Sequence, residues 1–268
     1  MAALGFVSDL DGTLLRSDGA ISPATFAMFG TLRDLDIPFL VATARTPRGV
    51  RKIDGHEIFG RMVCANGAVV WDAARDEVIW DRAFDATSLA VGVARVRRAL
   101  PDAGLALLSA RTSFLDATYV TLRGTGAKDA DLVFDPKAVM SGQRIVAVAV
   151  RHASLPSEEL LPIVSVAFAG AGLVSFSGIG AVEVAPVGMT KAVTVAVEQA
   201  DAGCPAGAVV AFGDMPNDLP LLAWAGWACA VANAHPSVLE AADEIVPAND
   251  EDGVARTVHR LLAARSPA

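Results

Sequence analysis

Two aspartates near the start of the chain, Asp9 and Asp11, have types and spacing that could do chemistry together. They follow an apolar run, residues 4–7, and precede a Gly12-Thr13 turn. If residues 4–9 form a buried strand, Asp9 stands at its carboxyl end, and side-chain alternation points both aspartates to one side. Two acids this close repel each other unless a cation or a shared proton lies between them. The alternative is a strand followed by an ordinary Asx-type turn.

Thr43, Asp214 and Asp218 also follow apolar runs later in the chain. Lys191 opens a predicted helix, an unusual place for a cation because cations favour the other end of a helix. Carboxylates with one lysine and one hydroxyl suit a Mg²⁺-bound phosphate, since Mg²⁺ prefers oxygen ligands and bridges carboxylates to substrate phosphate. Helix capping would explain Thr43 or Asp218 taken singly. All of these residues at one sheet edge favour a phosphate site with Mg²⁺ as its cofactor.

Strand-like and helical patterns alternate in the first and last parts of the chain. We expect strands at residues 4–9, 37–42, 62–65, 208–212 and 228–231, and a hairpin at 69–71 and 78–80. We expect helices at residues 24–34, 191–202, 219–225 and 253–264. This alternation predicts an α/β fold with a Rossmann-like, doubly wound and mostly parallel sheet. Ligands bind such sheets at the carboxyl ends of the strands, where Asp9, Thr43 and Asp214 are expected.

The pattern changes between residues 84 and 185. We expect helices at 87–100 and 157–169, strands at 105–109, 114–120, 144–151, 173–176 and 181–185, and a polar segment at 124–143. The uncharged stretch 160–182 is long enough to suggest a membrane span, but Pro162 and several glycines interrupt it, so we expect a helix, a turn and a strand. We therefore predict an α+β domain at 84–185, inserted into a discontinuous core of residues 1–83 and 186–268.

Composition narrows the classes of partner. The chain has 268 residues, of which 53% are apolar, and its net charge of −8 argues against nucleic acid as a partner. Its three cysteines form no CxxC pair, which argues against zinc and a disulfide framework and fits reduced thiols in the cytoplasm. The first apolar run has no basic residue before it, so we expect no signal peptide. We expect a cytoplasmic protein, monomeric or homodimeric, that binds neither nucleic acid nor membranes.

The motifs resemble those of a known family. Asp9 to Thr13 reads Asp-Leu-Asp-Gly-Thr, which is similar to the DxDGT signature of haloacid dehalogenase-like phosphatases. Thr43, Lys191 and the run 213–218 resemble the second, third and fourth motifs of that family, in the same order and around a similar inserted block. The layout is most similar to the Cof-type branch, in which the insertion is a large α/β cap. One departure is Ala44, where the second motif usually has glycine.

The resemblance implies a role for each site residue. Asp9 would attack phosphorus to form an aspartyl-phosphate, and Asp11 would act as general acid and then general base. Thr43 and Lys191 would hold the phosphoryl oxygens. Three further residues would contribute to phosphate binding, namely Gly12, Ala44 and Arg45. The Mg²⁺ ligands would come from Asp9, Asp11, Asp214 and Asp218. Asn217 would contact these ligands and not the ion itself.

The implied function is that of a Mg²⁺-dependent phosphomonoester hydrolase acting on a small phosphorylated metabolite, in first place a sugar phosphate. A phosphotransferase or phosphomutase using the same aspartyl-phosphate is one alternative, and a non-catalytic sugar-phosphate sensor is another. The cap would close over the site and choose the substrate. Four arginines could meet a second anionic group of a substrate, namely Arg45, Arg48, Arg111 and Arg123, although ordinary surface ion pairs would explain them equally well.

Overall fold

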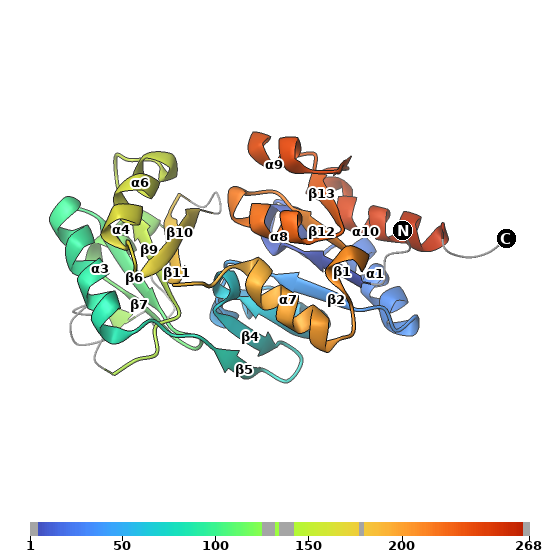
Figure 1. Cartoon of the computed structure of the whole chain (residues 1–268), viewed down its shortest axis with the longest axis horizontal. Helices are drawn as coiled ribbons and strands as arrows, with labels where there is room; N and C mark the ends of the chain where they lie inside the picture. The colour runs from blue at the N-terminus through green and yellow to red at the C-terminus, as the bar shows by residue number, and fades with distance from the viewer. Residues whose placement is uncertain (1–4, 125–131, 134–141, 177–179, 265–268) are drawn as a thin grey trace.

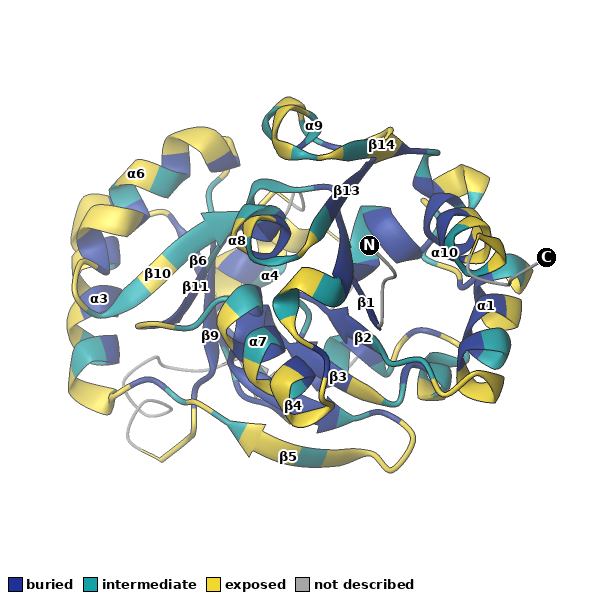
Figure 2. Ribbon diagram, turned by 45° about the vertical axis from the view of Figure 1, so that its right-hand side comes forward, coloured by how far each residue is buried: buried dark blue, intermediate teal, exposed yellow. Residues whose placement is uncertain are grey.

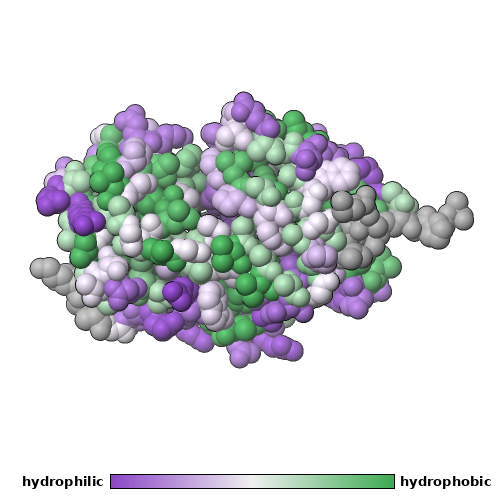
Figure 3. Space-filling model, viewed as in Figure 1, coloured by the Kyte–Doolittle hydropathy of each residue, from purple (hydrophilic) through white to green (hydrophobic). Residues whose placement is uncertain are grey.

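Two β-sheets organise the protein. A computed structural model describes residues 5–124, 132–133, 142–176 and 180–264, and these form two lobes with a notch between them (Figures 1 and 3). The larger sheet has the strand order β14-β13-β12-β1-β2-β3-β4-β5, and the smaller has the order β10-β11-β9-β6-β7-β8. We call the first the core sheet and the second the cap sheet.

The core sheet is parallel from β14 to β3 and ends in the antiparallel strands β4 and β5. Its strands are β1 Gly5–Ser8, β2 Phe39–Ala42, β3 Arg61–Cys64, β4 Val69–Asp72, β5 Glu77–Asp81, β12 Val209–Gly213, β13 Trp227–Val231 and β14 Glu244–Val246. Its helices are α1 Pro23–Asp34, α2 Pro47–Val50, α7 Lys191–Asp201, α8 Leu219–Trp224, α9 Pro236–Ala241 and α10 Gly253–Ala263. The pair α1 and α10 covers one face and the pair α7 and α8 the other (Figure 2), so the central strands are buried on both sides.

The cap sheet is mostly antiparallel, with α3 and α6 on one face and α4 packed against the other. Its strands are β6 Gly104–Leu108, β7 Ser113–Leu115, β8 Leu132–Val133, β9 Ala147–Arg151, β10 Gly172–Phe176 and β11 Val182–Pro186. The helices of this lobe are α3 Ala86–Ala99, α4 Ala117–Arg123 and α6 Ser157–Ala167. Alternate residues of β6, β9 and β11 form a second hydrophobic core with α3 and α6. The other face of the sheet looks toward the core lobe (Figure 1).

This architecture confirms the predicted α/β class, with a doubly wound, mostly parallel core sheet and an inserted α+β cap. The described part of the uncharged stretch 160–182 contains the end of α6, a turn and then strand β10, as expected, and β11 begins at Val182. Among the residues that the structure describes, every helix lacks the length and apolar character of a membrane span. The domain boundaries at 84 and 185 stay a prediction, and most of the polar segment 124–143 lies outside the described residues.

The expected strand 114–120 is wrong from Asp116 onward. The strand β7 ends at Leu115, and Asp116 begins α4 by accepting a hydrogen bond from the Tyr119 N–H at 2.6 Å. The aspartate also accepts from the Leu105 N–H at 2.9 Å, which fastens the start of α4 to β6. An aspartate that caps a helix outweighs the β-branched and aromatic residues that follow it. The sequence reading also missed α9 and β14, which are short.

Candidate active site

Asp9 is fixed at the carboxyl end of β1 by the sheet itself. β1 pairs with β12 on one side and β2 on the other. The Asp9 N–H donates to the Phe212 carbonyl at 2.9 Å, and the Ser8 hydroxyl donates to the Asp9 carbonyl at 2.6 Å. Asp9 is 5% exposed. Its carboxylate is therefore oriented by the fold before any ligand binds.

The turn that follows β1 brings Gly12 against Asp214. Gly12 has φ = +76°, and a Cβ at this position would lie 2.4 Å from the Asp214 Oδ2 atom. Glycine is required here on both grounds, because a side chain would strain the backbone and displace the carboxylate. The next residue, Thr13, donates its hydroxyl to Asp214 Oδ1 at 2.8 Å. Asn233 closes the turn from the other side by donating to the Gly12 carbonyl at 2.8 Å.

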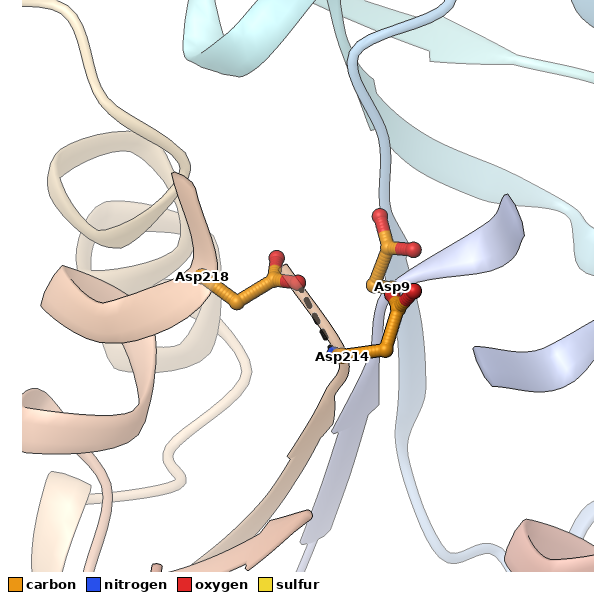
Figure 4. Close-up of side chains that lie close together, drawn as sticks. All are labelled: Asp9, Asp214 and Asp218. Carbon is orange, nitrogen blue, oxygen red and sulfur yellow. Dashed lines mark hydrogen bonds between the residues drawn. The ribbon is translucent and has the colours of Figure 1, made fainter. Parts of the chain in front are cut away.

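Asp214 and Asp218 belong to the loop after β12. Asp218 Oδ2 accepts the backbone N–H of Asp214 at 3.1 Å (Figure 4). The same oxygen accepts the Met215 N–H, also at 3.1 Å. Its Oδ1 accepts from Lys191 Nζ at 2.7 Å. Both oxygens of this fully buried carboxylate are thus engaged. Asp218 holds the backbone that carries Asp214 and, at the same time, the lysine that reaches Asp9.

Lys191, the first residue of α7, lies at the centre of the carboxylates. It is 1% exposed, and its Nζ donates to Asp9 Oδ1 and Asp218 Oδ1. Burial alone would lower the pKa of Lys191, but the charges of Asp218 and Asp9 outweigh burial and raise the pKa above its ordinary value. The helix starts here because Thr190 caps it, accepting the Val193 N–H at 3.2 Å. Lys191 is therefore a fixed positive charge against Asp9.

One lysine does not balance the negative charge of the site. Asp9, Asp214 and Asp218 offer ligand oxygens that lie within 4.8 Å of one another (Figure 4). Burial raises the pKa of Asp9 well above its usual range, and the neighbouring carboxylates add to that rise. Burial and the charge of Asp218 raise the pKa of Asp214 to about 7. An all-oxygen donor set with excess negative charge fits a hard divalent cation such as Mg²⁺.

The loop after β2 contributes Thr43 and Arg45. Thr43 is buried, and its hydroxyl accepts the Arg45 N–H at 3.0 Å. Arg45 donates two hydrogen bonds to the Asp11 carboxylate, from Nε to Oδ2 at 2.7 Å and from Nη2 to Oδ1 at 2.5 Å. Direct phosphate binding by Arg45 therefore stays a prediction, because its guanidinium is committed to Asp11. Ala44 has no positive φ, so this loop does not need the glycine that the family motif usually has.

The predicted residues converge on one cavity of about 380 Å³. Its lining includes all the predicted residues that reach the surface of the site, namely Asp9, Asp11, Thr43, Ala44, Arg45 and Asn217. Four of the predicted residues do not line it, namely Gly12, Lys191, Asp214 and Asp218. The opposite wall comes from the cap sheet and from α4. The cavity thus has a catalytic floor on the core and a wall on the cap.

Asn66 and Glu183 form a link across this cavity that the sequence reading missed. Asn66 donates Nδ2 to Glu183 Oε2 on β11 at 3.0 Å and accepts from Asn217 Nδ2 at 3.2 Å. Ala65 and Asn66 both have positive φ, 51° and 52°, and asparagine tolerates this conformation better than alanine. The Asn66-Gly67 pair signalled a turn in the sequence. Nothing in the sequence marked Glu183, 117 positions further along the chain, as the partner of Asn66.

Comparisons with known proteins agree with this geometry. The model of the haloacid dehalogenase-like hydrolase family matches residues 6–258. The chain is 42% identical to YxeH of Bacillus subtilis, over 71 residues that make up 26% of this chain and 24% of that protein. It is 24% identical to a phosphoglycolate phosphatase of Methanothrix thermoacetophila, over 96% of each chain.

The fold is also that of BT1666 from Bacteroides thetaiotaomicron, a phosphatase of the same superfamily. The two structures share 20% sequence identity and a TM-score of 0.83, with 97% of this chain and 95% of that chain covered. The family match extends over both parts of the core and the cap between them. The chain belongs to the haloacid dehalogenase-like hydrolase family.

Proposed function

We propose that the protein is a Mg²⁺-dependent phosphomonoester hydrolase that forms an aspartyl-phosphate on Asp9. The observation that carries the proposal is the Asp9 carboxylate, which lines the cavity while Lys191 holds it from behind. In the first step an oxygen of Asp9 attacks phosphorus, the ester P–O bond breaks, and Asp11 gives a proton to the leaving oxygen. In the second step Asp11 takes a proton from water, the water oxygen attacks phosphorus, and inorganic phosphate leaves Asp9.

The neighbouring residues have supporting roles in this proposal. Asp9, Asp214 and the Asp11 carbonyl would hold Mg²⁺, which would offset the charge that develops on the phosphoryl group. Asp218 orients Asp214 and Lys191, because both of its oxygens are already bonded to them and to Met215. Thr43 would bind phosphoryl oxygens, and Lys191, held against Asp9, would offset the charge that develops on them. One of the two Arg45 bonds must open for Asp11 to exchange a proton with the leaving group.

The substrate is proposed to be a small phosphorylated metabolite. A cavity of about 380 Å³ lies near the lower end of the usual range for small-molecule pockets. Sugar phosphates remain the first class to test. The phosphoglycolate phosphatases among the relatives add small phosphorylated acids to the panel.

Phosphate release tests this proposal. The substrates are sugar phosphates, phosphoglycolate and an aryl phosphate, each with Mg²⁺ and with EDTA. We expect metal-dependent release that falls by about 10⁴-fold or more in Asp9→Asn, the scale seen when a catalytic nucleophile is removed. Release that survives the substitution would exclude Asp9 as nucleophile. Transfer of phosphate to a sugar hydroxyl would identify a phosphotransferase, and tight binding without turnover would identify a sensor.

A further inference from the structure

The cap turns alternate residues of its strands toward the active-site cavity. Six residues of these strands belong instead to the hydrophobic core under α3 and α6, namely Leu105, Leu107, Val148, Val150, Val182 and Val184. The residues between them line the cavity, namely Ala106, Leu108, Ala149, Arg151 and Glu183. We call these five residues the cap wall. Ala106 pairs with Ala149 on the neighbouring strand, so the middle of the wall carries two small apolar side chains.

Tyr119 of α4 lies beside the cap wall and is held there by the backbone. The helix packs directly on β6 at Gly104, because a Cβ at Gly104 would come within 2.5 Å of the Tyr119 Cα atom. The Tyr119 N–H donates to Asp116, which also accepts the Leu105 N–H of β6. The tyrosine side chain is 7% exposed and belongs to one hydrophobic cluster with the two alanines of the cap wall. The fold therefore fixes the position of this aromatic ring in the lining of the cavity.

The hydroxyl is the part of the Tyr119 side chain that the protein does not engage. Arg151 lies over the ring, with 5.6 Å between the guanidinium carbon and the ring centroid. Among the residues that the structure describes, none forms a hydrogen bond with the Tyr119 hydroxyl. The hydroxyl is not sealed inside the protein either, so a ligand in the cavity can reach it. The hydroxyl of a largely buried tyrosine usually has a hydrogen-bond partner, and a ligand of this cavity would supply one.

We propose that Tyr119 is a specificity-determining residue. Its hydroxyl forms a hydrogen bond with a polar group of the leaving group, and the carbon skeleton of the leaving group lies against the alanines of the cap wall. This inference rests on the proposed function, because the phosphoryl group is taken to lie at Asp9. Asp9 and Tyr119 line the same cavity from the core and from the cap, so the leaving group must extend from one lobe to the other. We therefore expect hydroxylated leaving groups of several carbons to be preferred over the two-carbon leaving group of phosphoglycolate.

A series of substrates that lack single hydroxyls tests the inference. The substrates are glucose 6-phosphate and its 1-, 2-, 3- and 4-deoxy analogues, which share one phosphate ester. Tyr119→Phe should lower kcat/KM for glucose 6-phosphate about fivefold, the usual effect of losing one neutral hydrogen bond. One analogue should show a similar loss with the wild type and no further loss with Tyr119→Phe. Equal losses on all the substrates in Tyr119→Phe would show a merely structural role and overturn the inference, with the proposed phosphatase left intact.

Two further variants place the leaving group in the cavity. Thr118→Val removes a hydroxyl from an exposed position of α4 outside the cavity and is the matched control, with kcat/KM expected within about twofold of the wild type. Ala149→Val adds bulk at the middle of the cap wall. It should raise KM for glucose 6-phosphate about tenfold, because the added methyl groups occupy the space of the leaving group, and should change KM for phosphoglycolate less than about twofold. Equal effects of Ala149→Val on both esters would overturn the placement against the wall.

A spectroscopic measurement separates this inference from the catalytic proposal. Tyr119 is the only tyrosine of the chain, so labelling Asp9→Asn with 3-fluorotyrosine gives a single ¹⁹F resonance. Titration needs no turnover. Glucose 6-phosphate, ribose 5-phosphate or glycerol 3-phosphate should shift this resonance, and inorganic phosphate, which has no leaving group, should not.

A shift with an ester would support contact at Tyr119 even if no ester were hydrolysed. An unchanged resonance with all three esters would overturn the inference even if hydrolysis by the wild type were fast. An equal shift with inorganic phosphate alone would report a movement of the cap in place of a contact with the leaving group, and would overturn it as well.

Discussion

The catalytic floor and the cap wall are built in opposite ways. The floor holds its charged groups in a buried network, in which Asp9, Lys191 and Asp218 are each at most 5% exposed and bonded to one another. The cap wall consists of alternate residues of antiparallel strands, with small side chains at its centre and Arg123, which is exposed, beside it. Each charge on the floor depends on its neighbours, whereas the wall can change one residue at a time. We therefore expect the floor to tolerate fewer substitutions than the wall.

Removing the lysine of the floor should have the largest effect on stability. Lys191→Met leaves Asp9 and Asp218 buried without their cation, which typically costs about 3–5 kcal/mol of unfolding free energy. Urea denaturation in EDTA measures the change. The matched change at the wall, Arg123→Met, should cost less than about 1 kcal/mol because that residue is exposed. The contrast between floor and wall fails if the two variants lose similar stability.

Stability should also depend on pH through the carboxylates of the floor. The pKa of Asp214 is raised from 3.8 to about 7, so the folded protein holds this proton more tightly than the unfolded chain does. Without metal, stability therefore falls as the pH rises from about 4 through 7, by as much as a few kcal/mol, because one pKa unit corresponds to about 1.4 kcal/mol. Mg²⁺ competes with the proton, so its stabilising effect should grow over the same range.

Thermal unfolding at pH 5.5 and pH 8, each with Mg²⁺ and with EDTA, measures this dependence. We expect the gain in Tm from Mg²⁺ to be larger at pH 8. In Asp214→Asn the gain should be small at both values of pH. An equal gain in the wild type at pH 5.5 and pH 8 would contradict the assignment of Asp214 as a metal ligand.

Gly12 offers a smaller perturbation of the floor. Gly12→Ala places a Cβ against Asp214 and forces alanine into the left-handed region, at a cost of about 1–2 kcal/mol. The larger consequence should be catalytic, because the displaced carboxylate is a proposed Mg²⁺ ligand. The Mg²⁺ concentration for half-maximal phosphate release should rise at least tenfold. Gly19→Ala, at a glycine with positive φ but no atom near its Cβ, is the control for backbone strain alone.

The hydrogen bonds of Asn66 should have the smallest effect on catalysis. Asn66→Gly keeps the backbone conformation but removes the bonds to Glu183 and Asn217, which together are worth about 1–3 kcal/mol. Asn66→Ala adds the strain of a positive φ to the same loss. We expect both variants to raise KM more than they lower kcat, measured by steady-state kinetics. A glycine variant with unchanged KM would show that Asn66 does not couple the cap to the site.

The sequence predicts the floor better than the wall, for a physical reason. Residues such as Asp9 and Asp214 follow apolar runs, and a parallel sheet brings the ends of such runs to one edge whatever the rest of the fold does. The contacts of the cap depend on the register of antiparallel strands and on which face they turn to the core. Pairs such as Asn66 with Glu183 are set by that register, so no local pattern marks them.

The limits of local patterns appear within the floor as well. Arg45 and Asp11 were both expected at the site, Arg45 to bind phosphate and Asp11 to transfer a proton. Neither role implies that the two side chains pair with each other, as they do in the structure. In the cap, the β-branched and aromatic residues after Leu115 suggested strand until Asp116 capped a helix. In both places side-chain hydrogen bonds decided the outcome, and such bonds depend on geometry that spacing alone does not give.

The turn between β3 and β4 also bears on how stable this enzyme could be made. Ala65 holds a left-handed conformation that costs an alanine about 1–2 kcal/mol, and its hydrogen bonds to Arg45 and Ala68 come from its backbone alone. Glycine adopts that conformation without strain, and its greater freedom in the unfolded chain offsets part of the gain. Ala65→Gly is therefore a candidate for thermostabilisation by up to about 1 kcal/mol. A substitution in this turn could therefore raise the stability of the protein without changing any side chain of the site.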